Sequence, residues 1–193
     1  MKLRAIVAIV LLTAVACGKP KEEPQAQTIQ KSAEQAQKGG RSEGDVKPVE
    51  PVSLRDLIAL LPAPSGWQRE KPAGERTTSP VTFTDVSVRL MKGDATVTAK
   101  ITDSALNQVL LAPYATYLTG SYEHKTDHGY EKAIKVGDAP AFEKWDSGTR
   151  SGNLAVIVGG RFIVEIDGSS IDDPKVLHDV LDKTDLKKLA AMQ

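Results

Sequence analysis

The chain has 193 residues, of which 25 are acidic, 25 are basic and 26% in total are charged. Neither sign of charge dominates, so no strong electrostatic field draws in nucleic acid, and we expect no nucleic-acid partner. The only cysteine is Cys17, which excludes an intrachain disulfide and leaves no second thiolate for a metal cluster.

Residues 1–16 have the three-part layout of an export signal. Lys2 and Arg4 precede an uncharged apolar run, Ala5–Leu12, and small residues follow it up to Cys17. Crossing a bilayer takes about 20 apolar residues, and this run is shorter. The pattern therefore predicts a cleaved signal peptide and not a permanent transmembrane helix.

The residues around the cysteine, Ala14-Val15-Ala16-Cys17-Gly18, resemble the lipobox of bacterial lipoprotein precursors, although that family usually has leucine where this chain has Ala14. The resemblance implies cleavage before Cys17 and acyl chains, palmitate among them, that hold the protein on a membrane. Gly18 replaces the aspartate that retains such proteins in the inner membrane. In a two-membrane cell this implies the outer membrane, facing the periplasm. The alternative is an ordinary signal, cut at the same place, that leaves Cys17 unmodified.

Residues 17–52 follow as the lipidated cysteine and a predicted tether. From Gly18 to Val52 the chain is rich in Lys, Glu, Gln, Pro and Gly and has no aromatic residue. Such a segment cannot bury enough apolar surface to offset the entropy lost on ordering. We expect a disordered tether of about 35 residues with a root-mean-square reach of about 30 to 35 Å. A single globular domain is predicted over 53–193.

Helix signals stand at both ends of this domain and at its middle. Ser53 predicts the N-cap of a short amphipathic helix that ends before Pro62, and Asp173 with Pro174 predicts the start of another. Ser104 predicts the N-cap of a middle helix that kinks near Pro113. Between these signals, apolar residues that alternate or run together predict strands over 86–90, 97–101, 122–125, 130–136, 141–145, 154–158 and 162–166.

Tight turns between most of these strands predict antiparallel pairing. We expect an α+β fold, in which an antiparallel sheet of about six to seven strands packs with helices in an α/β sandwich. The order of the elements and the opening Pro64-Ser65-Gly66-Trp67 are similar to PsbP-like domains. This similarity spans most of the domain and implies a layout of elements, with no functional residue attached to it.

Aromatic side chains are the candidates for a binding surface. The aromatic set is large enough to line an apolar pocket or a partner surface, and its members are Trp67, Tyr114, Tyr117, Tyr122, Tyr130 and Trp145. Of these, Trp67, Tyr122, Tyr130 and Trp145 are the residues proposed for a binding surface. The domain has few phenylalanines, so the same rings are also candidates for the hydrophobic core. Both readings stay open at this point.

The sequence gives fewer indications of a catalytic site or a metal site than of a binding surface. Glutamates on predicted strands are candidates for an acid–base pair, and they are Glu123, Glu131, Glu143 and Glu165. His124 and His128 lie about 13 Å apart if they belong to a strand, so we expect no metal site there and no cofactor.

We interpret the chain as a membrane-anchored extracytoplasmic lipoprotein whose non-enzymatic domain binds a protein or a cell-envelope component. Two alternatives stay open. One is a hydrolase of envelope material that uses the strand carboxylates, and the other is a small-ligand carrier with an aromatic pocket.

Replacing Cys17 removes the predicted acylation site and leaves the export signal intact. We expect Cys17→Ser to move the protein from the membrane fraction to the soluble extracytoplasmic fraction, because the acyl chains are lost while export continues. Cell fractionation with immunoblotting measures this redistribution. A variant that still sediments with membranes after a high-salt wash would place the anchor elsewhere in the chain.

Overall fold

The computed structural model describes residues 49–192. The predicted signal peptide, Cys17 and the tether as far as Pro48 lie outside the described residues. Within 49–192, no helix is long and apolar enough to cross a membrane.

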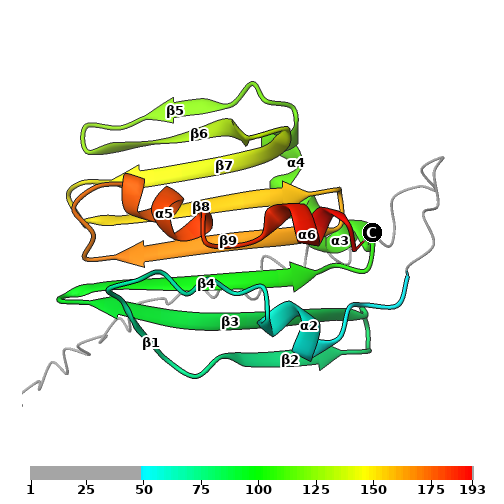
Figure 1. Cartoon of the computed structure of the whole chain (residues 1–193). Helices are drawn as coiled ribbons and strands as arrows, with labels where there is room; N and C mark the ends of the chain where they lie inside the picture. The colour runs from blue at the N-terminus through cyan, green and yellow to red at the C-terminus, as the bar shows by residue number, and fades with distance from the viewer. Residues whose placement is uncertain (1–48, 193) are drawn as a thin grey trace, which may run out of the picture. The chain divides into compact units, whose positions relative to one another are not determined.

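An antiparallel sheet of nine strands dominates the fold (Figure 1). Its strands follow the order β1-β3-β4-β9-β8-β7-β6-β5, and β2 also pairs with β3. Every pairing is antiparallel. The strands are β1 (Gln68–Arg69), β2 (Ala73–Thr77), β3 (Phe83–Lys92), β4 (Ala95–Asp103), β5 (Glu123–Lys125), β6 (Gly129–Val136), β7 (Ala139–Asp146), β8 (Ser151–Val158) and β9 (Phe162–Ser169).

The prediction of an antiparallel sheet is confirmed, and the predicted number of strands is too low. All the predicted strands are present, and β1 and β2 add to them. These two strands form one edge of the sheet, where nearly every residue is exposed. Edge strands that are exposed along nearly their whole length have no apolar alternation, so hydrophobic periodicity does not detect them.

Short helices lie on both faces of the sheet. They are α2 (Leu54–Ile58), α3 (Gln108–Leu111), the 3-10 helix η1 (Ala112–Tyr114), α4 (Ala115–Leu118), α5 (Lys175–Leu181) and α6 (Leu186–Ala190). Helices α2, α5 and α6 cover one face, here called the front, while α3 and α4 lie behind the sheet (Figure 1). With so few helical residues the fold is a sheet-dominated α+β fold, and the helices do not form the full layers of the expected sandwich.

Local signals placed α2 correctly and α5 to within one residue, but placed the middle helix badly. Helix α5 begins at Lys175, whose N–H donates to the predicted cap Asp173 at 2.7 Å, with Pro174 just ahead of the first turn. Ser53 caps α2 as predicted, because its Oγ accepts a hydrogen bond from the backbone N–H of Asp56 at 3.2 Å. Ser104 does not cap the middle helix. Ala105 and Leu106 have positive φ angles of 51° and 65°, which are incompatible with a helix, so α3 begins later and is capped by Asn107.

The main core lies between the sheet and the front helices. Alternate residues of β3, namely Val86, Val88 and Leu90, are buried in this core, and so are their counterparts on β4, β9 and β8. A smaller cluster lies behind the sheet, where Leu111 packs on Ile157 and Ile163. The two clusters use opposite sides of the same strands, as the two-residue period of a strand requires.

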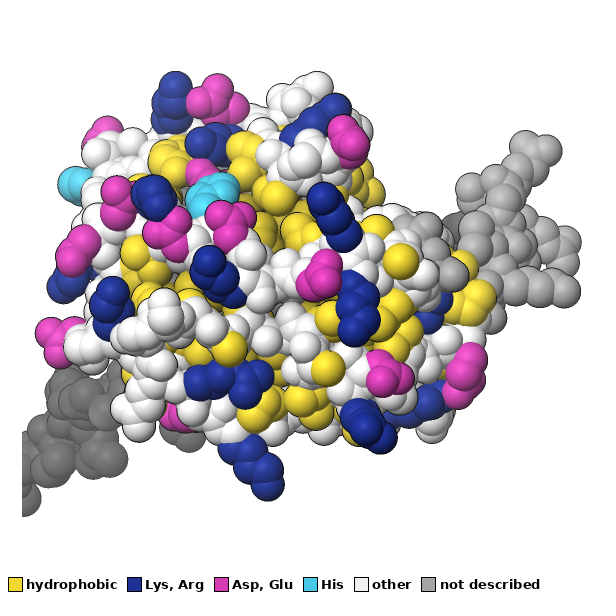
Figure 2. Space-filling view, viewed as in Figure 1, with side chains coloured by type: hydrophobic (Ala, Val, Ile, Leu, Met, Phe, Trp, Pro, Cys, Tyr) yellow, Lys and Arg dark blue, Asp and Glu magenta, His cyan; other side chains and the backbone are white. Residues whose placement is uncertain are grey.

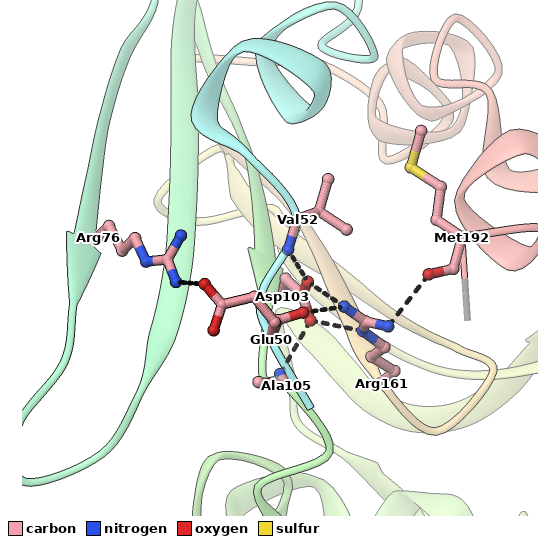
Figure 3. A network of polar contacts seen from close by, with 7 residues as sticks. All are labelled: Glu50, Val52, Arg76, Asp103, Ala105, Arg161 and Met192. Atoms are coloured by element: carbon pink, nitrogen blue, oxygen red, sulfur yellow. Dashed lines mark hydrogen bonds and ion pairs between the residues drawn. The ribbon is translucent and has the colours of Figure 1, made fainter. Parts of the chain in front are cut away.

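A buried ion pair closes one end of the sheet (Figure 3). The Arg161 guanidinium, in the turn before β9, donates to both carboxylate oxygens of Asp103 at the end of β4, at 2.8 and 2.7 Å. The side chain of Asp103 is 0% exposed and that of Arg161 is 6% exposed. Paired, bidentate hydrogen bonding is the arrangement that makes such deep burial of two charges tolerable.

Residues 49–52, the N-terminal strap, are held by this pair. The N–H of Val52 donates to Asp103 at 2.7 Å, and Arg161 donates to the backbone carbonyl of Glu50 at 3.2 Å. Arg161 also donates to the carbonyl of Met192 at 3.1 Å, so both ends of the described chain meet here (Figure 3). Residues 49–52, ahead of Ser53, are therefore packed against the sheet by these hydrogen bonds.

Asp103→Asn removes one charge of the pair and leaves Arg161 buried without a counter-ion. We expect a loss of about 3 to 5 kcal/mol in the free energy of unfolding, measured by urea denaturation. The double variant Asp103→Leu/Arg161→Met should recover part of the loss seen in Asp103→Leu alone, because no unpaired charge remains. A loss below about 1 kcal/mol in Asp103→Asn would contradict a structural role for the pair.

Candidate functional site

The structure brings together two of the four aromatic residues proposed for binding. Tyr130 on β6 and Trp145 on β7 are direct cross-strand partners on the front face. Trp67 and Trp145 both pack against the main core, and the Trp145 ring lies over Gly152, where a Cβ would come within 3.1 Å of it. Tyr122 projects to the opposite face, as its bond to Glu131 shows. The four residues do not form one surface.

Glu143 lies beside the Tyr130–Trp145 pair as a buried carboxylate. Tyr130 donates its hydroxyl hydrogen to Oε1 at 2.6 Å, and the Lys132 ammonium lies 3.1 Å from the same oxygen. The imidazole of His178, on α5, contacts the other carboxylate oxygen. The Lys132 ammonium is also 4.4 Å from the centre of the Tyr130 ring, a cation–π contact. The group links α5 to β6 and β7.

These contacts set the ionisation of Glu143. Burial alone would raise the pKa of Glu143, but hydrogen bonds from Tyr130, His178 and Lys132 offset it and hold the pKa below its ordinary value of 4.5. Burial and the bond to Glu143 raise the pKa of Tyr130. The Glu143 carboxylate is therefore charged at neutral pH and its oxygens accept hydrogen bonds from neighbouring side chains, as in a structural role. A general acid must instead be protonated at the working pH, which requires a raised pKa.

The other strand glutamates are also engaged. Glu165 accepts from the Tyr114 hydroxyl at 2.5 Å, and Glu123 pairs with Lys125. Glu131 is 2.7 Å from the Lys144 ammonium, which is the main cause of the lowered pKa of Glu131. Glu131 and Glu143 lie on opposite faces, because Glu131 is paired with the neighbour of Glu143 in the β6–β7 register. They do not flank a common cleft, as a hydrolase would require.

Hollows in the described part of the chain do not favour a carrier. The larger one, of about 420 Å³, is an open depression along Leu181–Lys187 and is lined by none of the proposed aromatic residues. A smaller one beside Tyr114, Tyr117 and Phe142 has no room for a water molecule.

The segment that connects β4 to β5 stands out by its lack of charge. Residues 104–122 form a run of 19 residues without Lys, Arg, His, Asp or Glu. At the 26% charged content of the chain, about five charged residues would be expected in that length. Much of this uncharged segment is nevertheless exposed, including Gln108, Val109, Ala112 and Leu118. Burial therefore does not account for the missing charges.

An aromatic cluster joins this segment to the back of the sheet. The Tyr117 ring, on α4, stacks on Phe142 of β7 with centroids 4.0 Å apart and planes 28° from parallel. Tyr117 also meets Tyr122 edge-on at 5.2 Å. Tyr122 in turn donates to Glu131 at 3.2 Å. These partly exposed rings are held in place by stacking and by hydrogen bonding at one edge of the cluster.

Exposed apolar side chains gather at the same segment. Among residues 49–192 the exposed large hydrophobic side chains are Val49, Val109 and Leu118, at 38%, 43% and 41%. Val109 and Leu118 belong to the uncharged segment, and the N–H of Val49 donates to the carbonyl of Ala105 at its start. By contrast, charged side chains are spread over the front face (Figure 2). The uncharged segment with its aromatic cluster is the candidate site.

Tyr114, Tyr117 and Tyr122 of this site were among the candidate aromatic residues in the sequence, whereas Val109, Leu118 and Phe142 were not candidates for binding. The signal that marks the site is the length of the charge-free run, which needs no structure to be seen. Its significance depends on exposure, because an uncharged run is ordinary when it is buried.

Comparison with protein-family models, with curated proteins and with solved structures finds no match to this chain. The resemblances to lipoprotein precursors and to PsbP-like domains stay predictions.

Glu143 should make the stability of the domain depend on pH. A carboxyl group whose pKa is lowered by folding stabilises the fold above its unfolded pKa of about 4.5, and this contribution is lost as the pH falls through the folded pKa. We expect Glu143→Gln to be less stable than the unmodified chain at pH 7, with the difference in stability narrowing as the pH falls below 4.5. Urea unfolding at several pH values measures it, with exposed Glu123→Gln as the control. A difference that stays constant with pH would contradict the assignment.

Proposed function

We propose that this protein is an extracytoplasmic lipoprotein, held on a membrane by acyl chains on Cys17, whose domain binds a protein or a cell-envelope component without catalysis. The outer membrane, facing the periplasm, is the expected location. The observation that carries the binding role is the exposed uncharged segment 104–122 with the aromatic cluster of Tyr117, Tyr122 and Phe142.

The composition of this surface supports recognition. Exposed apolar side chains beside ordered tyrosine rings are typical of contact surfaces, because they gain from leaving water and lose little conformational entropy. In a sequence with 26% charged residues, a long exposed run without charge is free of the desolvation cost that charged groups bring to an interface.

The state of the carboxylates supports a non-enzymatic role. Glu143 is surrounded by three donors, while Glu131 and Glu165 are engaged by a lysine or a tyrosine. A general base needs an available lone pair and access to substrate. The side chain of Glu143 is only 5% exposed, so a polymer of the envelope does not reach it.

Site-specific photo-crosslinking in the native envelope tests this function. We expect a photoreactive residue at Leu118 to give a defined adduct, whose captured component is identified by mass spectrometry, because Leu118 lies at the edge of the aromatic cluster. The same residue at Ala190, exposed on α6 at the front face, should give none. Equal capture at both positions, or capture at Ala190 alone, would contradict the assignment of the surface.

A further inference from the structure

We propose that the uncharged segment 104–122 rests on the interface of the bilayer that anchors the chain, so that the component it contacts is lipid. This inference rests on the proposed function, because it names the occupant of the same surface.

The first argument is where the chain from the anchor enters the fold. The strap at residues 49–52 is fixed to the buried ion pair Asp103–Arg161, and Val49 is bonded to Ala105 at 3.1 Å. Figure 1 shows α3 beside this end of the sheet. The described chain therefore begins, at Val49, directly next to the uncharged segment.

The second argument is the chemistry of the surface. Charged side chains are costly near the hydrocarbon boundary, and the segment has none over its 19 residues. Its exposed groups are apolar, such as Val109 and Leu118, or uncharged and polar, such as Thr116 and Thr119. Tyr117, which is partly exposed, supplies a ring with one polar tip, which suits the headgroup level of a bilayer. The hydroxyls of Tyr114 and Tyr122 are turned toward Glu165 and Glu131. A contact of this kind depends little on salt or on anionic lipid.

Only a few large apolar side chains are exposed on this surface, Val109 and Leu118 among them. A stable protein interface takes about 800 Å² from each partner, and the exposed large apolar side chains here are few. A weak contact suffices for a surface that is already tethered. A flexible chain of about 30 residues has a reach of about 30 Å, and a link of this length gives a millimolar effective concentration. An affinity that would be too low to hold a free partner is therefore enough to keep the tethered segment on the bilayer surface for much of the time.

Hydrogen–deuterium exchange of a membrane-coupled chain tests this inference. Residues 17–193 are coupled through the thiol of Cys17, the only cysteine, to maleimide lipid in phosphatidylcholine liposomes, and compared with the same chain after its thiol has been capped. We expect amide exchange over 104–122 to slow by about threefold to fivefold on coupling. This is the slowing expected if the dissociation constant is about millimolar and the effective concentration of the bilayer surface is a few times higher. The slowing should be the same in about 0.1 M and 0.5 M salt.

Two variants with equal charge changes make the test specific. Val109→Glu/Leu118→Glu places charge on the exposed part of the segment and should abolish the slowing. Ala63→Glu/Ala73→Glu adds the same charge at exposed positions near the β1–β2 edge and should keep it. Both substitute exposed residues, so native-like exchange in the core strands verifies their folding.

Unchanged exchange on coupling overturns the lipid contact. If the photoreactive residue at Leu118 then captures a protein, the proposed function stands and its partner is that protein. If Leu118 captures nothing and exchange is unchanged, both proposals fall. A lipid adduct at Leu118 together with slowed exchange supports both.

Discussion

Two opposite charges without solvent access, Asp103 and Arg161, hold several distant segments of the chain at one point. Arg161 has donors to spare after the bidentate bond, and it uses them on the backbone carbonyls of Glu50 and Met192. Asp103 likewise accepts from the N–H groups of Val52 and Ala105. Because unpaired buried charge is so costly, the position of the N-terminal strap is fixed along with the pair. The place of Val49 beside Ala105, where the described chain begins, depends on it.

The same constraint relates the strap to the uncharged segment. The bond of Asp103 to Ala105 holds the turn in which Ala105 and Leu106 adopt positive φ angles, and this turn delays the start of α3. The chain then crosses behind the sheet in short helical pieces, with Leu111 packed inward and Val109 and Leu118 outward. Helices this short bury little of their own surface. Their exposed side chains can be apolar without weakening the core.

Three tyrosines in this domain donate hydrogen bonds to buried or partly buried carboxylates. Tyr114, Tyr122 and Tyr130 each donate to a strand glutamate, namely Glu165, Glu131 and Glu143. A carboxylate on a partly covered strand loses water, and a phenolic hydroxyl replaces part of that hydration at short range. In this way the three glutamates act as hydrogen-bond acceptors within the fold. The tyrosine bond contributes to the lowered pKa of Glu143, together with His178 and Lys132, whereas the pKa of Glu131 is lowered mainly by the Lys144 ammonium.

The sequence by itself determined the antiparallel sheet and the cap of α2, because alternation and capping are local properties that the chain expresses within a few residues. The exposed edge strands β1 and β2 and the late start of α3 depended on contacts, or on their absence, outside any local window. Among the candidate site residues, strand register brings Tyr130 and Trp145 together on one face and places Tyr122 on the other. A shift of the register by one residue would exchange the two faces. Only the tertiary structure decided whether the charge-free run is buried or exposed, because this depends on how its helices pack on Ile157 and Ile163. The place of the strap beside the run was also decided there, because Val52 and Glu50 are held by Asp103 and Arg161, which are far from them in the sequence.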